Sequence, residues 1–291
     1  MDDLHINWRG PLASCNYDCD YCPFAKHVSS REELARDEAE LGRFVGWCRG
    51  PEAAARRLSI LFTPWGEALI RPYYAPALVE LSWLPHVSAV AIQTNLSSRL
   101  ERLAEAKRET LGLWTTFHPS QTTLESFVER CAQLDALGIR YSVGVVGLRE
   151  HFDLIDALRA RLRPDVYLWI NAYKSAGPGY YRDGERERLA AIDPLFRLNA
   201  VRHETRGQAC AAGRTALFVR GDGMTSRCHF VERPLGNLYE LGLAKLLREE
   251  PCPQQTCGCF IGYVQLDRLD LRRRFGAGLA ARMLPNSQQE L

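Results

Sequence analysis

Ten cysteines, most of them in two groups, limit what this 291-residue chain can be. The chain opens Met1-Asp2-Asp3 and has no apolar segment typical of a signal peptide, so we expect a cytoplasmic protein. Cytoplasmic thiols are kept reduced, and clustered cysteines there are metal ligands or catalysts before they are disulfides. Cys48 and Cys131 stand alone on apolar stripes of helical spacing and are predicted core residues. The other eight predict metal centres.

Composition excludes several classes of protein. The apolar fraction of 46% and the charged fraction of 25% are ordinary for a globular chain and exclude a disordered or fibrous one. The 37 basic residues nearly balance the 35 acidic ones, so nothing in the net charge points to nucleic acid or an anionic membrane as a partner. No run of 18 apolar residues predicts a membrane span.

Strands and helices alternate over the first 175 residues or so. Capping boxes at Ser30-Arg31-Glu32-Glu33 and Thr122-Thr123-Leu124-Glu125 predict helix starts, and Gly138 predicts the end of the second of these helices. Unbroken apolar runs predict parallel strands covered on both faces. This pattern fits a partial barrel and a doubly wound sheet equally, and both place the site at the carboxyl ends of the strands. The expected strands are 4–8, 58–62, 87–92, 111–117, 141–148 and 166–172.

The pattern changes after Lys174, where a turn-rich stretch begins. We predict an α/β domain at 1–180, a linker at 181–206 and a small α+β module at 207–263, followed by a tail at 264–291. In the module, Asp222-Gly223 between two apolar runs predicts a β-hairpin.

The first cysteine group has the spacing C-x3-C-x2-C, formed by Cys15, Cys19 and Cys22. Three thiolates can hold three irons of a [4Fe–4S] cube, and with no fourth cysteine nearby one iron stays open for chemistry. A structural zinc site would need four ligands. This motif, with Tyr21 just before the last cysteine, resembles the radical S-adenosylmethionine (radical-SAM) superfamily.

The resemblance implies a partial (β/α)6 TIM-like barrel and a cluster that binds S-adenosylmethionine. Reductive cleavage of S-adenosylmethionine gives a 5′-deoxyadenosyl radical, which abstracts hydrogen from the substrate. Gly66 and Glu67 match the pair that meets the amino group of the cofactor, and Thr94 and Asn95 match a common position after the third strand. The fifth strand matches the adenine-backing pattern only in part, because Val143 replaces its first glycine. The cofactor-binding residues implied are Tyr21, Gly66, Glu67, Thr94, Asn95, Ser142, Val145 and Gly147.

The second cysteine group resembles the auxiliary-cluster module of such enzymes. It has five cysteines, fewer than the seven of the SPASM form, so it resembles the shorter twitch form with one auxiliary [4Fe–4S] cluster. Cys210 and Cys228 are the implied ligands, and two of Cys252, Cys257 and Cys259 complete the set, with Cys252 and Cys257 preferred. With "FTPWGEAL" (62–69) and "CHFV" (228–231), the whole chain resembles a compact subfamily of these proteins.

The resemblance leaves the reaction open. We expect oxidation of a small molecule with the auxiliary cluster as electron acceptor, because only 14 residues precede Cys15 and leave no room for a leader-binding domain. The alternative is a maturase that modifies a ribosomally made peptide. A zinc-holding scaffold or thiol redox sensor is the alternative of another class. An electron donor such as flavodoxin or ferredoxin is implied. His118 and Lys174, just past strand ends, are the candidate catalytic residues.

Overall fold

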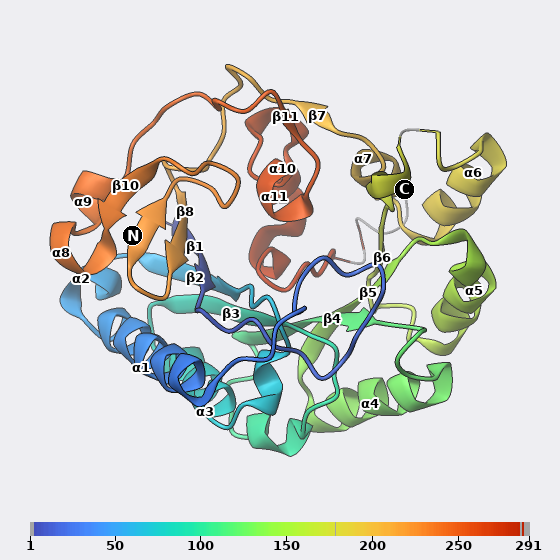
Figure 1. The fold of residues 1–291 in the computed structure, drawn as a ribbon, viewed down its shortest axis with the longest axis horizontal. Coiled ribbons are helices and arrows are strands. Elements are labelled where there is room, and N and C mark those ends of the chain that lie inside the picture. The colour runs from blue at the N-terminus through green and yellow to red at the C-terminus, as the bar shows by residue number, and fades with distance from the viewer. Residues whose placement is uncertain (1–2, 178, 286, 288–291) are drawn as a thin grey trace.

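One curved sheet organises the computed structural model, which describes residues 3–177, 179–285 and 287 (Figure 1). Within these residues the sheet has nine strands in the order β10-β9-β8-β1-β2-β3-β4-β5-β6. Six neighbouring strands run parallel in chain order, as the alternation of strand and helix predicted. They are β1 (Asp3–Arg9), β2 (Arg57–Phe62), β3 (Val87–Thr94), β4 (Leu111–Phe117), β5 (Arg140–Val146) and β6 (Leu168–Asn171).

The helices that connect these strands lie along the outer side of the sheet (Figure 1). They are α1 (Arg31–Cys48), α2 (Pro51–Ala54), α3 (Tyr74–Trp83), α4 (Leu124–Leu137) and α5 (Phe152–Arg161), followed by α6 (Asp183–Ile192) and α7 (Phe196–Asn199). Short 3-10 helices lie at Ala68–Ile70, Leu100–Leu103, Arg149–His151, Lys174–Ala176, Asp267–Leu269 and Gly276–Gly278.

The two predicted capping boxes have different outcomes. At α1 the Ser30 side chain accepts from the Glu33 backbone N–H and the Glu33 carboxylate accepts from the Ser30 N–H, so this box is confirmed. At α4 the prediction of Thr122 as the cap is wrong. Thr123 is the N-cap, and its hydroxyl accepts from Ser126 N, so the helix begins one residue later than expected. The helix ends at Gly138, where a φ of 68° favours glycine, as predicted.

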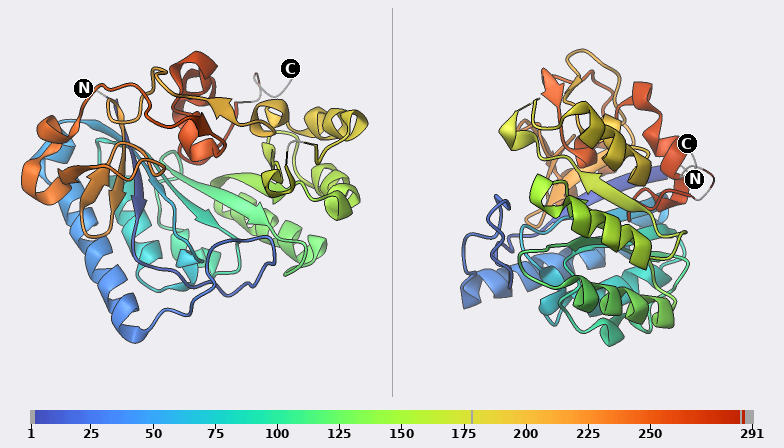
Figure 2. Two further views of the ribbon diagram at one scale, coloured as in Figure 1. Left: turned by 45° about the horizontal axis from the view of Figure 1, so that its top comes forward. Right: turned by 90° about the vertical axis from the view of Figure 1, so that its right-hand side faces the viewer.

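Both faces of the sheet are buried. Ile60 packs among the residues of the outer helices, whereas the next residue, Leu61, packs in a second cluster on the inner face. That second cluster joins Trp114 and Trp169 of the sheet to Phe260 and Phe275 of the C-terminal segment. Figure 2 shows the C-terminal segment on the side of the sheet opposite α1, α3 and α4. Coverage of both faces explains why the strands are unbroken apolar runs.

The predicted hairpin forms, and it continues the main sheet. β8 (Ala216–Arg220) pairs antiparallel with β9 (Met224–Ser226), which pairs with β10 (Pro234–Asn237). β8 also pairs in parallel with β1, so the sheet runs across the boundary predicted at residue 207. A small second sheet pairs β7 (His203–Glu204) with β11 (Thr256–Cys257). The remaining helices are α8 (Leu238–Leu241), α9 (Leu243–Leu246), α10 (Phe260–Tyr263) and α11 (Leu271–Phe275).

Among the residues described, no helix combines the length and the apolar character that crossing a membrane requires.

Candidate functional site

The first cysteine group lies on the loop between β1 and α1, which Figure 1 shows in dark blue over the central strands. Cys15, Cys19 and Cys22 line one cavity of about 280 Å³ at the carboxyl ends of the strands. Six residues that the sequence predicted line the same cavity, from the cysteine loop and from three strand ends. They are Tyr21 of the cysteine loop, Gly66 and Glu67 after β2, Thr94 and Asn95 at the end of β3, and His118 after β4. Asn171, at the end of β6, also lines the cavity.

The loop after β2 packs directly against the start of the cysteine loop. A Cβ on Gly66 would lie 1.8 Å from the carbonyl oxygen of Ser14, so only glycine allows this approach. The next backbone N–H, that of Glu67, donates to the same oxygen at 3.2 Å. Gly66 therefore sets the position of the chain immediately before Cys15.

Glu67 organises the neighbouring strand end. Its carboxylate accepts hydrogen bonds from Thr94 Oγ1 (2.9 Å), Asn95 N (2.6 Å) and Leu69 N (3.1 Å). Burial raises the pKa of Glu67 to about 7, and the three donors oppose that shift. The Asn95 side chain in turn donates to Asn16 Oδ1 at 3.2 Å and lies 3.8 Å from Cys15 Sγ. One chain of contacts thus runs from Glu67 to the first cysteine. Sequence reasoning missed Asn16, although its place directly after Cys15 was a signal.

His118 contacts the cysteine loop itself. Its Nδ1 lies 2.9 Å from the Tyr21 hydroxyl and 3.3 Å from Cys19 Sγ, and its ring is parallel to that of Tyr21 at 6.0 Å. Burial lowers the pKa of His118 to about 4, so the ring is neutral at neutral pH. In this arrangement the histidine supports the loop.

Three predicted cofactor residues are not brought to this cavity. Ser142 is fully buried, where its hydroxyl donates to Ala281 O at 2.6 Å and accepts from Trp169 Nε1 at 3.2 Å. Val145 packs in the outer core, whereas its neighbour Val146 lines the cavity. Gly147 packs against β6 instead, since a Cβ there would lie 2.9 Å from Ile170 Cγ2.

Four of the five C-terminal cysteines surround a second, apolar cavity. The four are Cys210, Cys228, Cys252 and Cys257. Burial raises the pKa of Cys228 and of Cys257 to about 12, so these thiols are protonated without a metal and would lose their protons to one. Among the residues described, no three histidine, cysteine, aspartate or glutamate side chains are spaced for a single metal ion. A [4Fe–4S] cubane does not need ligands that meet at one metal ion, because each of its thiolates binds a separate iron.

A buried arginine holds the segments of this cavity together. Arg227, which is 5% exposed, donates to the carbonyl oxygens of Ala212 (2.9 Å), Glu250 (2.6 Å) and Pro251 (2.7 Å). It precedes Cys228, and its partners flank Cys210 and Cys252, so it fixes three of the cysteine segments. Nothing in the sequence pattern marked Arg227 for this role.

Cys259 and Lys174 lie outside both cavities. Cys259 is exposed at the N-cap of α10, and its charge when ionised would raise the pKa of Lys174. Burial lowers the pKa of Lys174 to about 8, and its Nζ donates to Asn199 Oδ1 at 2.9 Å. Of the two predicted catalytic candidates, only His118 lines the cysteine cavity.

Comparison with known proteins gives the fold. No protein-family model matches the chain, and no curated protein matches it. Solved structures do match. One, of anSMEcpe with bound AdoMet (S-adenosylmethionine), has a TM-score of 0.55 and 13% identity and covers 85% of this chain and 80% of that one. Another, of Streptococcus suis SuiB bound to S-adenosylmethionine, has a TM-score of 0.53 and 14% identity and covers 85% of this chain and 66% of that one.

Both matched structures are radical-SAM enzymes, and this chain has their fold. The strand order, with six parallel strands and helices outside, is that of a partial TIM-like barrel. The resemblance drawn from the cysteine spacing is therefore confirmed for the fold.

Proposed function

We propose that this protein is a radical-SAM enzyme, with a [4Fe–4S] cluster held by Cys15, Cys19 and Cys22. The observation that carries the proposal is that these three cysteines line one cavity with Gly66 and Glu67 at the carboxyl ends of the parallel strands. Three thiolates leave one iron for the amine and carboxylate of S-adenosylmethionine. When bound, the reduced cluster supplies one electron that cleaves a C–S bond of S-adenosylmethionine into methionine and a 5′-deoxyadenosyl radical.

The protein's own residues position these groups. Asn95 links Cys15 to Glu67, and Gly66 fixes the chain before Cys15, so the loop has one arrangement relative to the strand ends. The buried Glu67 carboxyl group, whose pKa is raised to about 7 by burial, lies beside the cavity, and an ammonium group bound next to it would favour its ionised form. Thr116, Val146 and Asn171, from three strand ends, line the rest of the cavity and limit the access of water.

We assign Cys210, Cys228, Cys252 and Cys257 to an auxiliary [4Fe–4S] cluster. Four thiols around one apolar cavity match the four-cysteine ligation of such a cluster and leave no iron open. Its role would be to accept an electron from the substrate radical, which makes the reaction an oxidation. Cys259 is then free of the cluster, and Ser142, Val145 and Gly147 keep only a proposed role behind the cofactor. The chain would work in the reducing cytoplasm with flavodoxin or ferredoxin as donor.

A small molecule is the proposed substrate, and a peptide is the second candidate. The peptide reading has one observation in its favour. A structure of anSMEcpe that contains the Cp18Cys peptide as well as AdoMet shares the fold, with a TM-score of 0.52.

Iron and sulfide per chain after anaerobic reconstitution test the assignment. About eight of each is expected for two cubanes, and about four of each would remove the auxiliary cluster. Zinc with little iron would instead support the alternative hypothesis of a zinc-holding scaffold or thiol redox sensor. Replacement of Cys15, Cys19 and Cys22 together by alanine is expected to abolish formation of 5′-deoxyadenosine with dithionite as reductant. Full cleavage by that variant would refute the proposal.

A further inference from the structure

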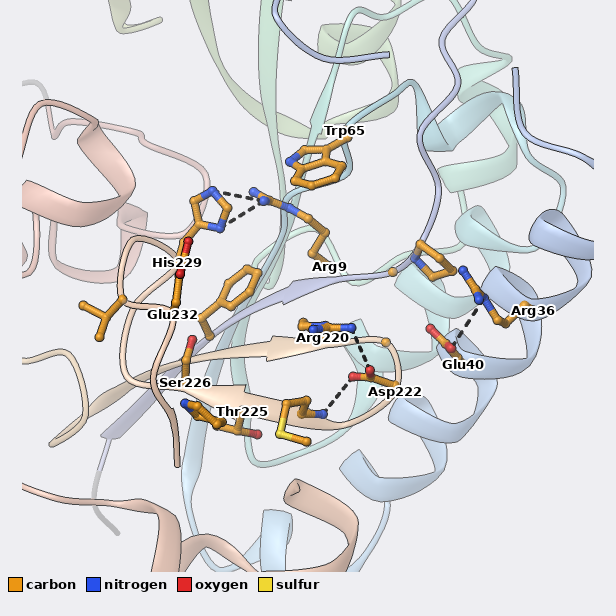
Figure 3. Close-up of a pocket in the computed structure, with 17 residues that line it drawn as sticks. Arg9, Arg36, Glu40, Trp65, Arg220, Asp222, Thr225, Ser226, His229 and Glu232 are labelled. Atoms are coloured by element: carbon orange, nitrogen blue, oxygen red, sulfur yellow. Dashed lines mark hydrogen bonds and ion pairs between the residues drawn. The ribbon is translucent and has the colours of Figure 1, made fainter. Parts of the chain in front are cut away.

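A larger cavity, of about 740 Å³, adjoins the cavity of the first cysteine group. It lies between the end of β1, the helix α1 and the β8–β9 hairpin (Figure 3). Trp65, from the loop after β2, lines both cavities, so they share a wall. A volume in the range of 300 to 1,000 Å³ is typical of sites for small molecules.

Arg9 lies within this cavity in a fixed orientation. Its guanidinium carbon lies 5.2 Å from the centre of the Trp65 ring and 5.3 Å from that of Phe218. Its Nε donates to Thr63 O at 2.6 Å, and its terminal nitrogens contact Thr63 Oγ1 at 3.2 Å and His229 Nδ1 at 3.0 Å. Figure 3 shows the group between Trp65 and His229. Rings and hydrogen bonds together hold the plane of the guanidinium in place.

The charge of Arg9 has no carboxylate partner among the residues described. The other arginines of the cavity are paired, Arg36 with Glu40 at 3.9 Å and Arg220 with Asp222 at 2.9 Å. All the groups that bond Arg9 are uncharged oxygens or an imidazole. Burial lowers the pKa of Arg9 only to about 10, so it is a cation at neutral pH. Beyond a charge interaction with the Cys259 thiol, the described residues give this partly buried cation no counter-ion, and an anionic ligand would supply one.

The donors left over suit such a ligand. A guanidinium has five N–H groups, and the contacts to Thr63 and His229 occupy three. One N–H remains on each terminal nitrogen. Paired N–H donors of arginine match the two oxygens of a carboxylate or phosphate group.

We propose that this cavity recognises the substrate and that Arg9 binds a carboxylate or phosphate group on it. This inference rests on the proposed function, because the neighbouring cavity then holds S-adenosylmethionine. Anchoring of the anionic group on Arg9 places the body of the substrate past Trp65, toward the first cysteine group. The substrate class is thus a small anionic molecule, or a peptide bound through a carboxylate.

The test measures anion binding by calorimetry on the anaerobically reconstituted full chain. The probes are succinate and inorganic phosphate, with succinamide as the uncharged control, at constant ionic strength. The variants are Arg9→Gln and, as control outside the cavity, Arg197→Gln, whose exposed charge is paired with Glu187 at 2.6 Å. We expect at least tenfold weaker binding of the preferred anion by Arg9→Gln and unchanged binding by Arg197→Gln. Preference for succinate or phosphate identifies the group on the substrate.

Equal binding by Arg9→Gln, equal binding of succinamide, or no anion binding by the unsubstituted protein would overturn the inference. If Arg9→Gln does not fold, Arg9→Lys keeps the charge without the planar fork and should bind with an intermediate affinity. Cleavage of S-adenosylmethionine without substrate separates the two proposals. Its absence in the unsubstituted protein refutes the proposed function, whereas its presence in every variant together with unselective anion binding refutes only the role of Arg9.

Discussion

The hydroxyl of Thr94 donates a 2.9 Å hydrogen bond to the carboxylate of Glu67, and this bond joins the end of β3 to the loop after β2. Both side chains are buried, with exposed fractions of 4% and 2%. The backbone N–H of Asn95 binds the same carboxylate, so the strand end that reaches toward Cys15 is held by Glu67. The carboxylate predicted to meet the cofactor is also part of the framework of the site.

Replacement of Glu67 by glutamine should therefore weaken both stability and cofactor binding. In glutamine, an NH2 group replaces one of the two carboxylate oxygens, and this NH2 group is a donor that faces other donors. At least one of the N–H and O–H groups that Glu67 accepts from is then left unpaired. We expect a loss of about 1–3 kcal/mol in the free energy of unfolding, measured anaerobically in urea. Equilibrium dialysis should show weaker binding of S-adenosylmethionine.

The control for this substitution is Thr94→Val, which keeps the carboxyl group of Glu67 but removes the hydroxyl that donates to it and accepts from Leu96 N. It should cost about 1–3 kcal/mol in stability and leave most of the affinity for S-adenosylmethionine. Stability of Glu67→Gln equal to that of the unsubstituted protein would contradict the framework role.

Gly66→Ala tests the contact between the two loops. The new Cβ would lie 1.8 Å from Ser14 O, so the cysteine loop has to move. We expect loss of the iron bound by the first cysteine group, measured as iron per chain. Gly42→Ala is the matched control, because nothing lies within 4 Å of a Cβ there. Gly42 lies in the middle of α1 on its exposed face, so Gly42→Ala should stabilise the protein by about 0.5–1 kcal/mol. Normal iron content in Gly66→Ala would show that the approach is not needed.

The sequence predicted the strands well because local patterns determine them. Apolar runs, the cap at Ser30 and the stop at Gly138 depend on neighbouring residues, and each was confirmed. The start of α4 was misplaced by one residue, because Thr122 and Thr123 are chemically equal caps and only the tertiary fold selects between them.

Side-chain direction and distant contacts were harder to predict. Successive side chains of a strand point to opposite faces of the sheet, so an error of one residue places a side chain on the wrong face. For this reason Val146 lines the cavity in place of Val145. Ser142 lies on the inner face but bonds Ala281, a residue 139 positions away that no local pattern connects to it. The unpaired charge of Arg9 also became visible only when the carboxylates of the fold had positions.

His5 gives a pH dependence of stability. Burial lowers the pKa of His5 to about 4 from 6.5, so the folded protein keeps the ring neutral where the unfolded chain would protonate it. Stability is therefore complete above pH 6.5 and falls as the pH drops toward 4, by about 1.4 kcal/mol for each pH unit. His5→Gln cannot take up this proton. The unsubstituted protein should lose about 2 kcal/mol more than His5→Gln between pH 7.5 and pH 5 in urea unfolding.

The control for the pH experiment is Gly42→Ala, which alters stability without changing a titratable group. This variant leaves His5 in place and should keep the pH dependence of the unsubstituted protein. Equal pH dependence in His5→Gln and the unsubstituted protein would rule out His5 as the source.

The last prediction distinguishes the ligands of the auxiliary cluster. Cys210 lines the apolar cavity of the second group with three other thiols, whereas Cys259 is exposed outside it. Cys210→Ser should lower the iron content from about eight to about four per chain, because a serine hydroxyl is a poor ligand for iron in a cubane. Cys259→Ser should keep about eight. An equal loss in the two variants would place Cys259 in the ligand set, and the assignment would then pass from Cys252 or Cys257 to Cys259. The corresponding serine variants of those two cysteines, measured in the same way, identify which one is replaced.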